Sequence, residues 1–154
     1  MSFLIRVGAA LEAAGVRYAL VGGFAVALHG AVRGTVDVDV ILEWDARTLR
    51  AAEQALQDLG LVSRLPITAD DVFRFRDEYI RNRNLIAWNF YNPRDLTEQL
   101  DIVMSTDLKG RKVQRIKTVD GPVQVLGRKD LIEMKRASGR PQDLADVEAL
   151  EMLR

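Results

Sequence analysis

The sequence predicts an α/β or α+β fold, in which a mixed β-sheet has flanking helices and the chain ends in a pair of helices. Helix-like and strand-like patterns alternate along the 154 residues, and some strands follow one another directly across short turns. No repeat or low-complexity linker divides the chain. We therefore expect a single domain over residues 1–154, large enough to bury a complete core.

Composition narrows the class of protein. Hydrophobic residues make up 48% of the chain and charged residues 29%, which is typical of a soluble globular domain. The absence of cysteine excludes disulfides, thiolate metal sites and cysteine nucleophiles. No apolar run approaches the ~20 residues of a membrane span, and the N-terminal stretch lacks the pattern of a secretory signal. These features predict a cytoplasmic protein with no membrane partner.

The first part of the chain combines helices with a short strand. Residues 3–14 carry apolar side chains at helical spacing, which predicts an amphipathic helix. Residues 18–21 form an apolar run typical of a buried strand. After the pair Gly22-Gly23, residues 24–29 suit a short apolar helix.

The clearest strand covers residues 35–42. Three valines alternate there with Thr35, Asp37, Asp39 and Ile41, so the two sets lie on opposite faces. The strict alternation predicts a strand that places both acids on the same face.

The middle of the chain predicts helical segments and two strands. Residues 46–59 place leucines on one helical face, and residues 68–83 are expected to be helical after Thr68 as N-cap. Residues 85–91 and 100–105 predict two strands, joined by a loop that is long for a tight hairpin.

The last third predicts a hairpin and the helical pair. Strands over residues 113–119 and 123–126 bracket a turn, and helices are expected over residues 131–137 and 141–153. Residues 109–140 contain ten basic and three acidic side chains, although the whole chain balances 22 of each. This local excess of positive charge is suited to meet phosphates.

Asp37 and Asp39 are the first candidates for chemistry. Two residues apart on a strand, they lie with roughly 6–7 Å between their Cα atoms. Two acids flanked by valines either need a cation to neutralise them or face water. With oxygen ligands, no cysteine and one histidine, the sequence favours Mg²⁺ or Mn²⁺ over zinc.

The glycine pair is the second candidate. Gly22 and Gly23 follow a predicted strand and precede a helix, where glycine lets backbone N–H groups approach a phosphate closely. The alternative is an ordinary turn between strand and helix.

Together these segments resemble a known family. Residues 21–30, which contain the glycine pair, and residues 33–40, which read Arg-Gly-Thr-Val-Asp-Val-Asp-Val, are similar to the signature of the nucleotidyltransferase superfamily. They most resemble the branch that contains abortive-infection nucleotidyltransferase toxins. Residues 130–135 and 139–146 also resemble this branch, so the resemblance extends from about residue 16 to the C-terminus.

The resemblance implies a set of site residues. The glycine pair would lie at the nucleoside triphosphate, two acids would bind a divalent metal, and a third acid would come from a later strand. The third acid would also take the proton of an acceptor hydroxyl. Lys135 is a candidate phosphate contact, with a solvated helix face as its alternative. The expected catalytic and metal-binding residues are Asp37, Asp39 and Asp101, and the expected nucleotide-binding residues are Gly22, Gly23, Arg33, Thr35 and Lys135.

The function predicted in this way is transfer of a nucleoside monophosphate from an NTP to a hydroxyl acceptor, with Mg²⁺ or Mn²⁺ as cofactor. The acceptor could be RNA or tRNA, a protein or a small molecule, and a second copy or a partner chain could complete the pocket. Many members of the superfamily have serine where this chain has Gly23. The missing hydroxyl favours one alternative, a catalytically silent nucleotide-binding or toxin–antitoxin interaction domain. Another alternative is an RNA-binding module that uses the basic segment.

Overall fold

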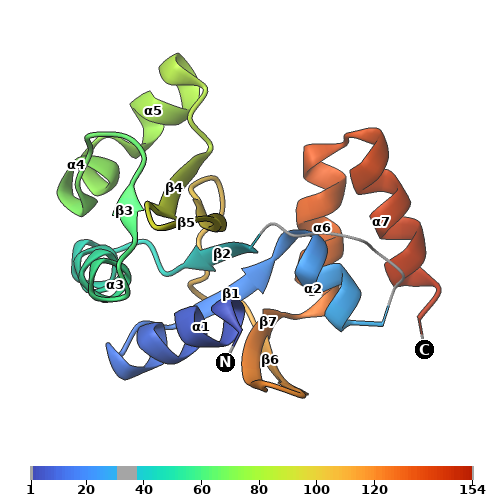
Figure 1. The fold of residues 1–154 in the computed structure, drawn as a ribbon. Coiled ribbons are helices and arrows are strands. Elements are labelled where there is room, and N and C mark those ends of the chain that lie inside the picture. The colour runs from blue at the N-terminus through green and yellow to red at the C-terminus, as the bar shows by residue number, and fades with distance from the viewer. Residues whose placement is uncertain (1, 31–37, 154) are drawn as a thin grey trace.

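A computed structural model describes residues 2–30 and 38–153 of the chain (Figure 1). In chain order, the described strands are β1 (Tyr18–Val21), β2 (Val38–Leu42), β3 (Val62–Ser63), β4 (Ala87–Asn92), β5 (Asp95–Val103), β6 (Val113–Thr118) and β7 (Gly121–Leu126). The described helices are α1 (Phe3–Ala13), α2 (Gly22–Leu28), α3 (Ala46–Asp58), α4 (Ala69–Arg74), α5 (Arg76–Arg83), α6 (Arg128–Ser138) and α7 (Pro141–Glu151).

The strands form one mixed sheet in the order β3-β4-β5-β2-β1-β7-β6. At its centre, β2 pairs antiparallel with β1 and parallel with β5, and β1 pairs parallel with β7 on its other side. The antiparallel hairpins β4–β5 and β6–β7 extend the sheet in the two directions. The predicted fold class, a mixed sheet with flanking helices, is therefore confirmed.

Helices pack around this sheet. Helix α1 contacts β1, β7 and α3, and α2 contacts β1, β2 and β7. Helices α6 and α7 pack side by side and form the predicted C-terminal pair (Figure 1). Tyr18, Trp88 and Phe90 are the largest fully buried side chains of the core. In the described part of the chain, no helix is both long and apolar enough to cross a membrane.

Helix starts follow the local sequence. Ser2 caps α1, and the Asp45 carboxylate caps α3 by accepting a hydrogen bond of 2.8 Å from the backbone N–H of Thr48. Thr68 caps α4 as predicted and forms a reciprocal capping box with Asp71. These side chains satisfy backbone donors that have no partner within the helix.

The stretch over residues 68–83 is helical as expected, but the helix is interrupted at Phe75, which separates α4 from α5. The next residue is held by tertiary contacts. Arg76 donates a hydrogen bond of 2.7 Å to the Met104 carbonyl, and its guanidinium lies 4.7 Å from the ring centroid of Trp44. Local periodicity contains no information on either contact.

The prediction of a long loop between β4 and β5 is wrong. Strand β5 begins at Asp95, so Pro93 and Arg94 alone form the turn of a tight hairpin. Most residues at the start of β5 are exposed, which removes the apolar alternation that marks a strand. Asn92 supports the extension by donating a hydrogen bond of 3.0 Å to Glu98.

Candidate active site

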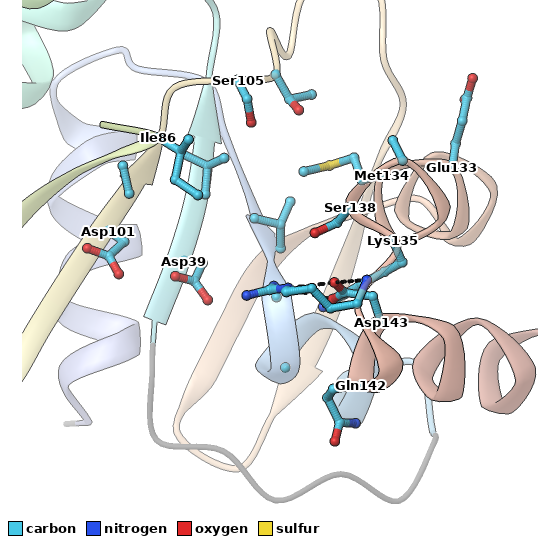
Figure 2. A pocket seen from close by; sticks show the side chains of 18 of the residues that line it. Asp39, Ile86, Asp101, Ser105, Glu133, Met134, Lys135, Ser138, Gln142 and Asp143 are labelled. Carbon is cyan, nitrogen blue, oxygen red and sulfur yellow. Dashed lines mark hydrogen bonds and ion pairs between the residues drawn. The ribbon is translucent and has the colours of Figure 1, made fainter. Parts of the chain in front are cut away.

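Two of the predicted acids meet at the centre of the sheet. Asp39 on β2 and Asp101 on β5 are direct partners in the register of these parallel strands. Neighbouring strands lie about 4.8 Å apart, and residues in register project from the same face. Figure 2 shows both carboxylates side by side at the edge of a cavity. The expectation that a later strand brings Asp101 to the acid of β2 is consistent with this geometry.

The other predicted residues of this segment lie outside the described residues. They are Arg33, Thr35 and Asp37. Within the described parts of the chain, no three acidic or histidine side chains gather as a group that could hold a metal ion. Asp39 and Asp101 supply hard oxygen donors, the type that Mg²⁺ and Mn²⁺ prefer. The donor chemistry of these two carboxylates therefore fits such an ion.

The glycine pair begins a helix instead of forming a separate turn. Gly22 and Gly23 are the first two residues of α2, and both line the cavity. Gly22 has a φ of +72°, and a Cβ atom there would lie 2.2 Å from Oδ2 of Asp39. Only glycine combines this conformation with this close approach. Gly22 therefore makes room for the Asp39 carboxylate.

Beside Asp101 lies a series of hydrogen-bonded polar side chains that the sequence did not predict. Asn89 on β4 pairs with Asp101 in register, and its Nδ2 donates a hydrogen bond of 2.8 Å to Asp101 Oδ1. The Asn89 Oδ1 accepts a hydrogen bond of 2.8 Å from Nε of Arg64. The available signal was an amide between Trp88 and Phe90, on the face opposite these buried rings.

The opposite wall of the cavity carries cations from the helical pair. Lys135 on α6 is 11% exposed, and its Nζ lies 3.4 Å from Asp143 Oδ1 and 3.2 Å from Asp146 Oδ2. Arg140, just before α7, donates from Nε to Asp143 Oδ2 over 2.7 Å, yet its side chain is 74% exposed. Lys135 thus joins α6 to α7 (Figure 2), while Arg140 also exposes most of its side chain to solvent.

The charges of this wall shift two pKa values. Burial alone would raise the pKa of Asp143, but hydrogen bonds from Arg140 and Ser138 and the charges of Lys135 and Arg140 lower it to about 2. The pKa of Arg140 is raised, mainly by its hydrogen bond and charge pairing with Asp143 and also by the charge of Asp39. Arg140 therefore interacts electrostatically with acids on both walls of the cavity.

The cavity has a volume of about 850 Å³, within the range of small-molecule sites. The acids and the glycine pair line one part of it, and Lys135 and Arg140 line another. Ile86, directly before β4, and Met134 of α6 add apolar surface from opposite sides (Figure 2). The cavity can therefore bind an anionic group and an apolar or aromatic group together.

The predicted basic segment is partly neutralised within the fold. Five of its ten basic residues form ion pairs with other described residues: Arg111, Arg115, Lys135, Arg136 and Arg140. Their partners are acids of α1, α6 and α7. The excess of positive charge in the sequence thus overstates the charge that this surface offers to a nucleic acid.

The fold is similar to those of solved nucleotidyltransferases. The lincosamide antibiotic adenylyltransferase LnuA, in a lincomycin-bound structure, matches with a TM-score of 0.64 at 15% identity, covering 99% of this chain and 96% of that chain. An antigenic nucleotidyltransferase-like protein from Paracoccidioides brasiliensis matches with a TM-score of 0.59 at 16% identity, covering 96% and 74%. ANT(2″)-Ia, in complex with adenylyl-2″-tobramycin, matches with a TM-score of 0.58 at 12% identity, covering 95% and 84%.

By sequence, neither a family model nor a curated protein matches the chain. The particular resemblance to abortive-infection toxins thus stays a prediction. The structural similarity extends over nearly the whole described fold, and it identifies the architecture of this chain as the nucleotidyltransferase fold.

Proposed function

We propose that this protein is a metal-dependent nucleotidyltransferase, which transfers a nucleoside monophosphate from an NTP to a hydroxyl acceptor. The observation that carries the proposal is the lateral pairing of Asp39 with Asp101, beside Gly22 in the cavity of a nucleotidyltransferase fold. The alternative is that the acidic face of the strand is simply exposed to water. That alternative does not explain why Gly22 accommodates one of these carboxylates so closely.

Asp39 and Asp101, together with Asp37, would hold the Mg²⁺ or Mn²⁺ ion. When bound, such an ion neutralises phosphate charge and supports in-line displacement at the α-phosphorus. Asp101 accepts the proton of the acceptor hydroxyl. The hydroxyl oxygen forms a bond to the α-phosphorus, the bond between that phosphorus and the bridging oxygen breaks, and pyrophosphate leaves with the bonding electrons.

Of the two cations on the helical wall, Arg140 is the better candidate for a phosphate contact. Lys135 is held between two buried acids, and removing one partner from a buried ion pair costs roughly 3–5 kcal/mol. Arg140 keeps its bond to Asp143 through Nε and still exposes 74% of its side chain. A guanidinium can therefore meet phosphate oxygens without disrupting the pairing of α6 with α7.

Small hydroxylated molecules are the first class of acceptor to test. Among the similar structures, LnuA contains bound lincomycin and ANT(2″)-Ia contains adenylyl-2″-tobramycin. A cavity of about 850 Å³ has room for a nucleotide and part of an acceptor. RNA, tRNA and protein acceptors are tested in parallel. A protein that is strictly monomeric under active conditions would contradict the expectation that a second copy or a partner chain completes the pocket.

The experiment is a thermal-shift panel of the four common NTPs, each with and without Mg²⁺ or Mn²⁺. Binding at about 100 times Kd adds about 2.7 kcal/mol. At about 2–4 °C per kcal/mol, the melting temperature of a domain of this size rises by about 5–11 °C. We expect a shift that requires metal and disappears in Asp39→Asn. A metal-dependent shift of the same size in Asp39→Asn would contradict the proposal.

Transfer is then followed with labelled NTP. Release of pyrophosphate together with labelling of an acceptor supports the enzyme. Metal-dependent NTP binding without transfer to any of these acceptors would instead support the silent nucleotide-binding domain, for which the glycine at position 23 is the specific observation.

A further inference from the structure

We propose that Asn89, held by Arg64, is a positioning residue that fixes the orientation of the Asp101 carboxylate for metal binding. This inference rests on the proposed function, because it assigns to Asp101 the metal contact described above. Neither Asn89 nor Arg64 belongs to the site residues that the sequence predicts.

The orientation of the Asn89 amide follows from hydrogen-bond chemistry. A guanidinium has only donors, so the atom 2.8 Å from Nε of Arg64 must be the amide oxygen. The amide nitrogen then faces Asp101 Oδ1, again at 2.8 Å. Both ends of the amide therefore have a partner of the right kind, and neither hydrogen bond survives if the amide is reversed.

Arg64 is itself fixed at several points. Its guanidinium lies 4.5 Å from the centroid of the Tyr91 ring, and its backbone N–H donates a hydrogen bond of 2.9 Å to the carbonyl of Asn89. Because β3 ends at Ser63, this contact continues the pairing of β3 with β4 for one more residue. The hydrogen-bonded side chains of Arg64, Asn89 and Asp101 are thus anchored to the backbone of the sheet.

This anchoring has a consequence for ligand binding. One oxygen of Asp101 is engaged by Asn89, which restricts rotation of the carboxylate before any ion arrives. Ordering a side chain in advance lowers the cost of binding. Polar groups that hold metal ligands in this way typically change metal affinity by about 10–100-fold when they are removed.

A purely structural role for Asn89 makes a different prediction. The hydrogen bond would then stabilise the hairpin of β4 and β5 without affecting the affinity for an ion. The chain offers a matched control on the same strand, because Asn92 donates a similar hydrogen bond of 3.0 Å to the Glu98 carboxylate. Of the two carboxylates that these amides hold, Asp101 lines the cavity, whereas Glu98 is not among the described residues that line it.

The experiment measures Mn²⁺ binding by electron paramagnetic resonance, together with urea unfolding, for the wild type, Asn89→Leu, Asn92→Leu, Arg64→Met and Asp39→Asn. We expect Asn89→Leu to weaken Mn²⁺ binding about 10–100-fold. Arg64→Met is expected to weaken it in the same direction by less, and Asn92→Leu to leave it unchanged. Arg64 is exposed, so its variant carries the test if Asn89→Leu does not fold.

The outcomes separate this inference from the proposed function. Wild-type affinity in a folded Asn89→Leu, or in Arg64→Met if only that variant folds, would overturn the positioning role alone. Equal weakening in Asn89→Leu and Asn92→Leu would also overturn it, because a general loss of hairpin stability would then account for both. A wild type without Mn²⁺ binding, or with binding that Asp39→Asn leaves intact, would overturn the proposed metal site and this inference with it.

Discussion

Replacing Gly22 with alanine should separate the strain of the backbone from the position of Asp39. Gly22 has a φ of +72°, and an added Cβ would lie 2.2 Å from Asp39 Oδ2 and 3.1 Å from its Cγ. Gly15 has nearly the same φ, +73°, with nothing within 4 Å of an added Cβ. Gly15→Ala is therefore a control that carries the conformational cost without the contact.

The expected magnitudes follow from these two differences. The left-handed conformation costs a non-glycine residue about 1–2 kcal/mol, so both variants should lose that much stability. In Gly22→Ala the Asp39 side chain must also rotate away, and an off-rotamer side chain costs about 0.5–1.5 kcal/mol more. The displaced carboxylate no longer lies beside Asp101, so Mn²⁺ and NTP binding should be lost in this variant alone.

The assay combines urea unfolding with Mn²⁺ titration on both variants. We expect similar, moderate losses of stability, with Gly22→Ala the less stable, and a loss of binding confined to Gly22→Ala. Wild-type Mn²⁺ affinity in a folded Gly22→Ala protein would refute the reasoning, because the close contact would then have no influence on where the Asp39 carboxylate lies.

Two further predictions concern stability. The lowered pKa of Asp143, about 2 against 3.8, corresponds to about 2 kcal/mol, which is present above pH 4 and lost as the pH falls toward 2. The difference in unfolding free energy between the wild type and Asp143→Asn should therefore shrink over that range in urea unfolding, because the wild type loses this contribution. A difference that stays constant with pH would contradict this. Thr68→Ala should lower the free energy of unfolding by about 1 kcal/mol through loss of the capping box of α4, and an unchanged urea midpoint would contradict it.

Much of the fold could be predicted because its elements carry local signals. The strand over residues 18–21 and the helix that begins at residue 46 were recognisable from burial pattern and periodicity, and both match the structure closely. Strand β3 could not be predicted, since two residues contain no period. The break at Phe75 comes directly before Arg76, which contacts Met104 and Trp44, and no local pattern encodes these distant contacts.

The residues of the candidate site also differ in how far the sequence could predict them. Asp39 was recognisable because the alternation of its strand is strict, and Asp101 because the resemblance asks for a later acid on a strand. The role of Lys135 was harder to predict, because its two acidic partners lie on the following helix, at positions that also suit an exposed helix face. Asn89 depends on the register between β4 and β5, and a shift of one residue would turn the amide to the other side of the sheet. Local sequence therefore marks the candidate catalytic groups, while the groups proposed to orient them emerge only when the strands are paired.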